Sequence, residues 1–321
     1  MRILLIKTSS MGDVIHNLPV VSDIVTRFPE AQIDWVVEEN FADIPRLNPH
    51  VRRVIPVALR RWRKALFAGD TWSEVREFHR ALRHEIYDYV IDTQGLLKSA
   101  LITFFTRGMR YGYDADSARE GLATVAYDRR FAVATTLHAV VRNRALVAQA
   151  LGGAVYTPLN YGITPSSVIN ERRTTAVLLT ATSRDDKLWS EANWVALGCH
   201  LSAHGLVCQL AAGSAIERER ATRLAQQIPN AIALPAQGLA ALAQVLSAAQ
   251  IVVGVDTGLV HLAAALGRPT VAIYCASDPT LTGVLAATPF VNLGSITHAP
   301  SAIEVIAVTD GLLESSLTVA H

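Results

Sequence analysis

Lysine, hydroxyl and carboxylate side chains gather in seven residues near the N-terminus, Lys7-Thr8-Ser9-Ser10-Met11-Gly12-Asp13. They follow a short apolar run, Arg2–Ile6, and precede a helical pattern. Ligands of open parallel sheets bind beyond the carboxyl ends of strands, and the backbone N–H groups that begin a helix attract anions. Lys7 would add a positive charge, and Asp13 is a candidate general base. The segment equally fits a structural role in which Ser10 and Asp13 cap the helix.

A second turn of the same kind is Gly254-Val255-Asp256-Thr257-Gly258-Leu259-Val260-His261. Thr257 and Gly258 would offer N–H groups to a phosphate, and His261 lies one turn into the following helix. Asp256 could accept sugar hydroxyls or act as a cap. Because four polar functions lie within six residues, we favour a pyrophosphate site over a purely structural turn.

The third segment is Thr182-Ser183-Arg184-Asp185-Asp186-Lys187-Leu188-Trp189. Its hydroxyls and Lys187 could bind phosphate as charge-assisted donors. The two adjacent carboxylates raise the question of a divalent metal, but they alternate with Arg184 and Lys187 and no third acid is nearby. We therefore interpret Asp185 and Asp186 as surface charge balance and expect no metal.

Charge is unevenly distributed along the chain, although the 321 residues sum to only +1. Residues 1–160 carry 21 Lys and Arg against 17 Asp and Glu, whereas residues 161–321 carry 8 against 11. The excess peaks in Arg60-Arg61-Trp62-Arg63-Lys64. A solvated helix face and a nucleic-acid patch are alternatives, but one short patch in a neutral chain is weak support for nucleic acid. An anionic acceptor or a membrane surface fits better, since each basic residue near an anionic lipid surface contributes about 1 kcal/mol.

Several other classes lose their sequence support. No GxGxxG follows either opening strand, Gln94-Gly95-Leu96-Leu97-Lys98-Ser99 is only a partial P-loop, and GxSxG is absent. His200 and His204 lack the HExxH pattern of a zinc site. Three cysteines without a CxxC pair, together with no signal-peptide pattern and no 18-residue apolar stretch, predict a cytoplasmic protein whose membrane contact is peripheral.

Both halves open with a strand that leads through a polar turn into a helix, which is the β–α unit of a parallel sheet. Gly152–Thr175 is the best linker candidate, so we predict an α/β chain of two doubly wound domains, 1–160 and 161–321, with a cleft between them. The expected strands are Arg2–Ile6, Ile33–Val37, Val54–Val57, Tyr89–Ile91, Ala176–Leu179, Val207–Leu210, Ile251–Val255 and Thr270–Tyr274. The expected helices, besides the first, are Thr71–His84, Leu97–Thr106, Thr136–Leu151, Ser190–Ala203, Ile216–Gln227, Leu239–Ala248, Leu259–Leu266 and one at the C-terminus.

These segments together resemble the lipopolysaccharide heptosyltransferase I family, and the match runs in order from the N-terminus to about Asp278. It is carried by KTSSMGDVIHNLP at 7–19, DWVVEENFADIP at 34–45, RVIPVALRRWRKA at 53–65, DTQGLLKSA at 92–100, TSRDDKLW at 182–189 and VDTGLVHLAAALGRP at 255–269. The resemblance implies a GT-B fold, that is, two Rossmann-like domains with the active site in the interdomain cleft. It also allows a C-terminal helix that packs back on the N-terminal domain.

The activity implied by the resemblance is inverting, metal-independent transfer of L-glycero-D-manno-heptose from ADP-heptose to the acidic sugar Kdo of Kdo2-lipid A, on the cytoplasmic face of the inner membrane. Asp13 would deprotonate the attacking hydroxyl. Because a free aspartate with a pKa of about 3.9 is a weak base, we expect burial in the closed cleft to raise its pKa.

The resemblance also assigns binding residues. The C-terminal domain would bind the donor, with Glu217 on the ribose, the Gln237 backbone at the adenine and Asp256 at the heptose. The diphosphate would be held by Thr182, Ser183, Lys187, Thr257, Gly258 and His261. Ser183 and Gln237 depart from the threonine and methionine that the family leads us to expect. The N-terminal domain would bind the acceptor through Lys7, Ser10, Arg60, Arg61, Arg63, Lys64 and Arg119.

Three other functions stay open at this point. Another transferase of the same fold would act on a later core acceptor. A nucleotide-sugar epimerase would turn over the donor with no acceptor present. A nucleotide-sugar-binding protein without activity would bind ADP-heptose and release no ADP.

Overall fold

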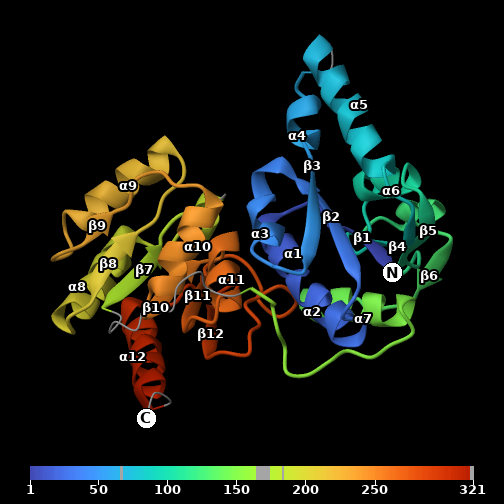
Figure 1. Cartoon of the computed structure of the whole chain (residues 1–321). Coiled ribbons are helices and arrows are strands. Elements are labelled where there is room, and N and C mark those ends of the chain that lie inside the picture. The colour runs from blue at the N-terminus through green and yellow to red at the C-terminus, as the bar shows by residue number, and fades with distance from the viewer. Residues whose placement is uncertain (66–67, 164–173, 183, 319–321) are drawn as a thin grey trace. The chain divides into compact units, whose positions relative to one another are not determined.

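The computed structural model describes residues 1–65, 68–163, 174–182 and 184–318. The chain divides into two compact units, an N-terminal unit of Met1–Ile163 and a C-terminal unit of Thr164–His321. Each unit holds one six-stranded sheet in which every paired strand is parallel (Figure 1). The α/β fold class expected from the repeated strand–turn–helix pattern is therefore confirmed.

The sheet of the N-terminal unit has the strand order β3-β2-β1-β4-β5-β6. Its strands are β1 (Arg2–Ile6), β2 (Gln32–Glu38), β3 (Val51–Val57), β4 (Tyr87–Asp92), β5 (Gly108–Tyr113) and β6 (Arg129–Phe131). Its helices are α1 (Met11–Ile15), α2 (Leu18–Arg27), η1 (Glu39–Phe41), α3 (Asp43–Arg46), α4 (Leu59–Trp62), α5 (Gly69–Arg83), α6 (Leu97–Phe104), η2 (Gly121–Ala126) and α7 (Ala139–Ala150).

Helices cover both faces of this sheet because the central strand β1 is apolar on both sides. On one face Leu4, Ile6 and Val90 pack with Trp62 of α4 and with side chains of α5 and α6. Helices α2 and α7 lie side by side in the other layer. Beyond this core, α5 projects from the body of the unit (Figure 1), and most of its side chains are exposed.

The sheet of the C-terminal unit has the order β12-β11-β10-β7-β8-β9, the same sequence of crossovers as the first. Its strands are β7 (Thr175–Leu179), β8 (Val207–Leu210), β9 (Ile232–Ala233), β10 (Ile251–Val255), β11 (Thr270–Tyr274) and β12 (Phe290–Gly294). Its helices are η3 (Asp185–Lys187), α8 (Glu191–Ala203), α9 (Ala215–Ala225), α10 (Leu239–Ala248), α11 (Gly258–Ala265) and α12 (Ala302–Thr318).

Helix α12 belongs to the core of the C-terminal unit. Its fully buried Val305 joins a cluster with Trp194 and Leu197 of α8 and with the strands of that sheet, and Ile306, Val308 and Leu312 pack against the same cluster. These contacts place α12 in the core of its own unit, and the packing back on the N-terminal domain that the resemblance allows stays a prediction.

In both units the strand order reverses beside the first strand, between β1 and β4 and between β7 and β10. Ile6 pairs with Asp92 at the first of these positions, and Leu179 pairs with Gly254 at the second. The chain that leaves one strand of each pair therefore runs to one side of the sheet, and the chain that leaves the other strand runs to the opposite side. This leaves a crevice at the carboxyl ends of the two strands, where ligands of such folds bind. The polar segments singled out in the sequence follow these four strands.

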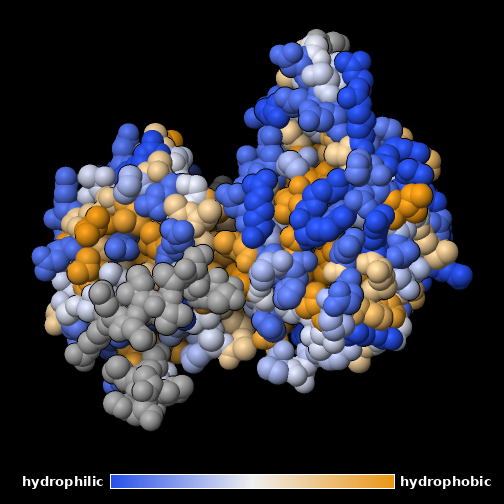
Figure 2. Space-filling view, in the orientation of Figure 1, coloured by the Kyte–Doolittle hydropathy of each residue, from blue (hydrophilic) through white to orange (hydrophobic). Residues whose placement is uncertain are grey.

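No helix among the described residues is both long and apolar enough to cross a membrane. Figure 2 shows hydrophilic and hydrophobic side chains interspersed on the visible faces of both units.

Candidate active site

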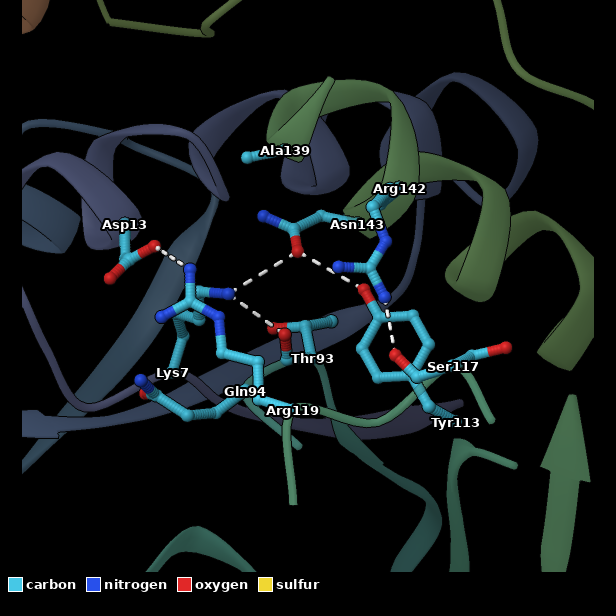
Figure 3. A pocket seen from close by; sticks show the side chains of 10 residues that line it. All are labelled: Lys7, Asp13, Thr93, Gln94, Tyr113, Ser117, Arg119, Ala139, Arg142 and Asn143. Atoms are coloured by element: carbon cyan, nitrogen blue, oxygen red, sulfur yellow. Dashed lines mark hydrogen bonds and ion pairs between the residues drawn. The ribbon is translucent and has the colours of Figure 1, made fainter. Parts of the chain in front are cut away.

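A polar pocket lies at the crossover point of the first sheet, beyond β1 and β4 (Figure 3). Residues from β1, β4, β5 and α7, or from the loops that follow them, point into it. Its lining is Lys7, Asp13, Thr93, Gln94, Tyr113, Ser117, Arg119, Ala139, Arg142 and Asn143. Three cations and one carboxylate in one pocket fit a ligand that is itself anionic and carries a group from which a proton can be taken.

Asp13 lies in the first turn of α1 and uses both carboxylate oxygens. Oδ2 accepts from the backbone N–H of Ser10 at 3.0 Å and from its hydroxyl at 3.2 Å. Oδ1 accepts from the Arg119 guanidinium at 3.0 Å, and the Asp13 side chain is 13% exposed against 44% for Arg119. The Asp13 carboxylate therefore both caps α1 and is the candidate general base. The structural and the catalytic interpretation of this segment do not exclude each other.

In the N-terminal unit as it stands, the pKa of Asp13 is lowered, and the rise expected for a closed cleft stays a prediction. Burial does raise the pKa of this carboxyl, but the charges of Lys7 and Arg119 and the two bonds from Ser10 outweigh it, so the pKa lies below the ordinary value of 3.8. Sequence reasoning counted the burial and missed the effect of the cations. Lys7, which lowers the pKa most, lies only six residues before Asp13, but its inward direction does not follow from the sequence, and Arg119 is 106 residues away along the chain. Asp13 is thus ionised at neutral pH, and it becomes a better base only when a cation leaves it.

Lys7 forms the floor of the pocket. It is 4% exposed, and its ammonium donates to the Thr93 carbonyl at 2.8 Å and to Asn143 Oδ1 at 3.3 Å. Burial lowers the pKa of Lys7 to about 8, although the nearby Asp13 charge opposes the shift. Lys7 follows the end of β1, as the sequence predicts, but its side chain points into the unit rather than into solvent.

Gln94 positions the loop that carries the candidate base, a role that the sequence did not reveal. Its Oε1 accepts from the backbone N–H groups of Thr8 and Ser9 at 2.7 and 3.2 Å, and its Nε2 donates to the Ser9 carbonyl. Asp92, fully buried at the end of β4, accepts from the N–H groups of Gln94 and Gly95. Gly95 has a φ of +67°, which a side chain would strain, so the motif from 92 to 95 shapes this turn.

The four cations of the basic run differ in how they are held. Arg61 pairs with Glu39 at 3.0 Å and with Glu74 at 2.8 Å, so its charge is already balanced. Arg60 stacks over the ring of Phe41 at 5.5 Å. Arg63 and Lys64 are exposed, and within the described part of the chain no ion pair involves them. The run therefore offers fewer available charges than its composition suggests.

In the C-terminal unit the polar groups at the corresponding crossover point gather around Asp256. Its Oδ2 pairs with the Lys187 ammonium at 2.5 Å and accepts from the Ser277 hydroxyl at 2.7 Å, while Thr182 donates to its backbone carbonyl at 2.8 Å. Burial raises the pKa of Asp256, but the bonds from Lys187 and Ser277 lower it by more. The pKa therefore lies below its ordinary value, and the carboxylate is ionised. Ser277, after β11, was not singled out from the sequence.

Helix α11 begins beside this carboxylate. Thr257 is its N-cap residue, Gly258 is its first residue, and both are partly exposed at the end of β10. His261 lies one turn into this helix and is buried. The structure thus brings Thr182, Lys187, Asp256 and His261 to one helix N-terminus, although 74 residues separate the first from the third. Such a terminus with a lysine is suited to a phosphate.

The resemblance assigns three further residues to the donor, namely Glu217, Gln237 and Ser183. Glu217 closes a capping box at the start of α9, because its Oε2 accepts from the N–H groups of Gly213 and Ser214 at 2.8 and 2.9 Å. Gln237 is half-buried in the loop before α10. Ser183 lies outside the described residues.

The carboxylates of Asp185 and Asp186 do not converge. Asp186 pairs with Arg184, and both side chains are exposed, as expected for surface charge balance. Within residues 1–65, 68–163, 174–182 and 184–318, no three histidine, cysteine or acidic side chains cluster as metal ligands would.

Comparison with known proteins agrees with this geometry. A family model described as glycosyltransferase family 9 (heptosyltransferase) matches residues 75–304. The chain is 46% identical over 288 residues to lipopolysaccharide heptosyltransferase 1 of Escherichia coli strain K12, which covers 88% of this chain and 90% of the relative.

Solved structures extend the likeness to the fold. E. coli heptosyltransferase WaaC with ADP matches with a TM-score of 0.92 at 41% identity, covering 97% of this chain and 100% of that chain. The same enzyme with ADP-2-deoxy-2-fluoro heptose matches with a TM-score of 0.89, covering 97% and 99%. These matches confirm the predicted GT-B fold class and the resemblance on which it was based.

Proposed function

The chain belongs to glycosyltransferase family 9, and on this premise we propose that it transfers L-glycero-D-manno-heptose from ADP-heptose to the Kdo of Kdo2-lipid A, with inversion, in lipopolysaccharide inner-core synthesis. The observation that carries the proposal is the carboxylate of Asp13 held among Lys7, Arg119 and Arg142 in the N-terminal pocket. A pocket of this kind suits an acceptor that has both a carboxylate and a nucleophilic hydroxyl, as Kdo has.

Asp13 is the general base in this reaction. As the Kdo hydroxyl oxygen attacks the anomeric carbon of heptose, its proton passes to Asp13 and the bond from that carbon to the phosphate oxygen breaks, so that ADP leaves with the bonding electrons. In-line attack inverts the anomeric centre. The residues of this chain need only orient the two groups and stabilise the departing charge.

Arg119 controls when Asp13 is basic. In the unliganded unit the guanidinium lies 3.0 Å from Asp13 and keeps its pKa low. The exposed Arg119 can instead pair with the acceptor carboxylate, since Arg binds carboxylates bidentately. When Arg119 turns to the acceptor, Asp13 loses one cation and its pKa rises. The acceptor thereby helps to activate the base that deprotonates it.

The C-terminal unit binds the donor, and ADP departs from it without a metal. Lys187 and the N–H groups at the start of α11 are available for the diphosphate, and Asp256, fixed by Lys187 and Ser277, is placed to accept sugar hydroxyls. A lysine and a helix N-terminus can together take up the charge that a divalent ion would otherwise neutralise. Excess EDTA should leave the rate unchanged, and a loss restored by Mg²⁺ would contradict this part of the proposal.

The acceptor is a membrane glycolipid, so we place the reaction at the cytoplasmic face of the inner membrane, with the N-terminal unit bound peripherally. The available cations of the basic run, together with Lys7, Ser10 and Arg119, would meet its acidic sugars and phosphates. This assigns the acceptor to the unit with net positive charge and the donor to the other.

A direct test is to incubate the protein with ADP-heptose and Kdo2-lipid A and to follow the mass of the glycolipid. We expect a gain of one heptose and release of one ADP per transfer. Transfer only to an acceptor that already carries heptose would instead assign a later step of the core. ADP release without any acceptor, or binding without release, would favour the epimerase or the binding protein.

A further inference from the structure

Helix α6 carries a row of exposed apolar side chains. Leu97, Leu101 and Phe104 are spaced four and three residues apart, so they lie on one side of the helix, and they are 50%, 59% and 58% exposed. The opposite side, with Ile102 and Thr103, is buried against the unit. The apolar side chains of α6 thus point both inward and outward, and the core accounts only for those that point inward.

The short helix η2 continues this surface. Its Ala123 and Ala126 pack on Ala100 of α6, whereas its larger apolar side chains, Leu122 and Val125, are 72% and 77% exposed. We call the five residues Leu97, Leu101, Phe104, Leu122 and Val125 the α6–η2 face. Figure 2 shows hydrophobic surface in the region of the N-terminal unit where Figure 1 places α6 and β5.

Cations surround the α6–η2 face. Lys98 and Arg119 lie at the end near the pocket, while Arg107 follows the other end, where Arg110 lies over the ring of Phe104 at 5.7 Å. Two of these cations are already balanced, because Arg119 pairs with Asp13 at 3.0 Å and Arg110 pairs with Asp128 at 2.6 Å. Among the described residues no ion pair involves Lys98 or Arg107, so one uncompensated cation lies near each end of α6. An apolar centre with a cationic rim is the pattern of surfaces that bind anionic lipid.

The α6–η2 face is continuous with the pocket. Leu97 follows the pocket residue Gln94 by three positions, and Leu122 follows Arg119 by three. Water-exposed apolar patches of this kind are rare on monomers without a function. An anionic bilayer satisfies both the apolar centre and the uncompensated cations Lys98 and Arg107.

We propose that the α6–η2 face is the surface by which the N-terminal unit docks on an anionic lipid bilayer, with the five apolar side chains entering the headgroup region. The inference rests on the proposed function only for its purpose, which is to present the pocket to a lipid-anchored acceptor. Docking itself needs no acceptor and can be measured without one.

The first experiment measures binding to vesicles by sedimentation, without acceptor or donor. The vesicles are phosphatidylcholine, with or without about one third phosphatidylglycerol. The test variant is Leu101→Ser/Val125→Ser, which changes no charge and no pocket residue. The matched control is Ile216→Ser/Ile303→Ser, since these side chains are each 80% exposed in the C-terminal unit. We expect the test variant to bind anionic vesicles about tenfold or more weakly than wild type and the control to bind as wild type does.

The second experiment separates docking from catalysis. With acceptor embedded in anionic vesicles, the test variant should raise the acceptor KM about tenfold, whereas with a deacylated, water-soluble acceptor its KM and kcat should equal those of wild type.

If wild type transfers heptose to the soluble acceptor but both variants bind vesicles equally, docking by this face is wrong and the proposed function stands. If wild type binds vesicles as predicted but transfers to neither acceptor, the proposed function is wrong and docking stands. A wild-type dimer that the test variant converts to a monomer, with vesicle binding unchanged, would overturn the docking proposal.

Discussion

The two units have the same strand order, and each places an aspartate and a lysine at the crossover point, but the two carboxylates are held differently. Asp256 is fixed by Lys187 and Ser277, and the Lys187 side chain is only 18% exposed. Asp13 is paired with Arg119, which is 44% exposed. The exposed Arg119 can turn from its carboxylate to a ligand, whereas the enclosed Lys187 would bind a phosphate while it stays beside Asp256. The fold therefore supplies the same crossover point twice, and the exposure of the counter-ion distinguishes the two carboxylates.

The strongest test of this difference is Asp13→Ala. Loss of the base should lower kcat by about 100-fold to 10,000-fold, because general bases contribute factors of this size. ADP affinity, measured by calorimetry, should stay within a few-fold of wild type, since its site is assigned to the other unit. Asp116→Asn, an exposed acid of the same unit, is the control and should be fully active. Retained turnover in Asp13→Ala would remove Asp13 from the base role.

The second largest effect is expected when the charges of the basic run Arg60–Lys64 are removed. The triple variant Arg60→Gln/Arg63→Gln/Lys64→Gln should raise the acceptor KM by about 100-fold at low salt, from about 1 kcal/mol per charge, and leave the donor KM unchanged. Arg61→Gln alone should do much less, because Glu39 and Glu74 already balance its charge.

The control for the triple variant is Arg76→Gln/Arg129→Gln/Arg130→Gln, which removes the same charge elsewhere on the N-terminal unit. Equal effects of the two triple variants, or equal effects on both substrates, would contradict an acceptor surface at this run. An Arg61→Gln effect as large as that of the whole set would mean that its ion pairs open on binding.

On the donor side, Lys187→Met should weaken ADP binding by about 10-fold to 100-fold, through loss of a charge-assisted bond of about 1.5–3 kcal/mol. The neighbouring Arg184→Met removes an exposed cation that pairs with Asp186 and should change ADP affinity little. Calorimetry with ADP alone measures both. If the two variants bound ADP equally well, Lys187 would not be a phosphate ligand.

The smallest effect concerns pH. Because burial lowers the pKa of Lys7 to about 8, this lysine is charged at pH 7 and largely neutral at pH 9. The acceptor KM should therefore rise a few-fold over this interval while the donor KM stays constant. Asp13, with its lowered pKa, stays ionised throughout and cannot be the cause.

A stability measurement checks the same titration independently. The unfolded chain keeps the Lys7 proton up to about pH 10.5, so from pH 8 upward it binds more protons than the folded chain. The free energy of unfolding of wild type should then rise relative to Lys7→Met. Urea unfolding at several pH values measures this difference, and a difference that stays constant with pH would show that Lys7 does not titrate in this range.

Local sequence was enough to locate the strands and helices that have strong apolar patterns. β1, β8, β10, β11 and α10 have the predicted bounds, because each is an apolar run between clear turn residues. The outer strands β5, β6, β9 and β12 were missed. GMRYGY contains two glycines and an arginine, and β9 has only two residues, so these strands exist because a neighbour offers hydrogen bonds rather than because their own pattern requires it.

The sequence by itself determined the fold class, the two parallel sheets and the segments that carry the site, since strand–turn–helix order and residue types are local properties. Tertiary structure alone decided how those groups behave. Lys7 and Arg119 together lower the pKa of Asp13, Gln94 fixes the loop beside Lys7, and Glu74 pairs with Arg61. Charge–charge energies depend on distance and burial, and neither follows from spacing along the chain.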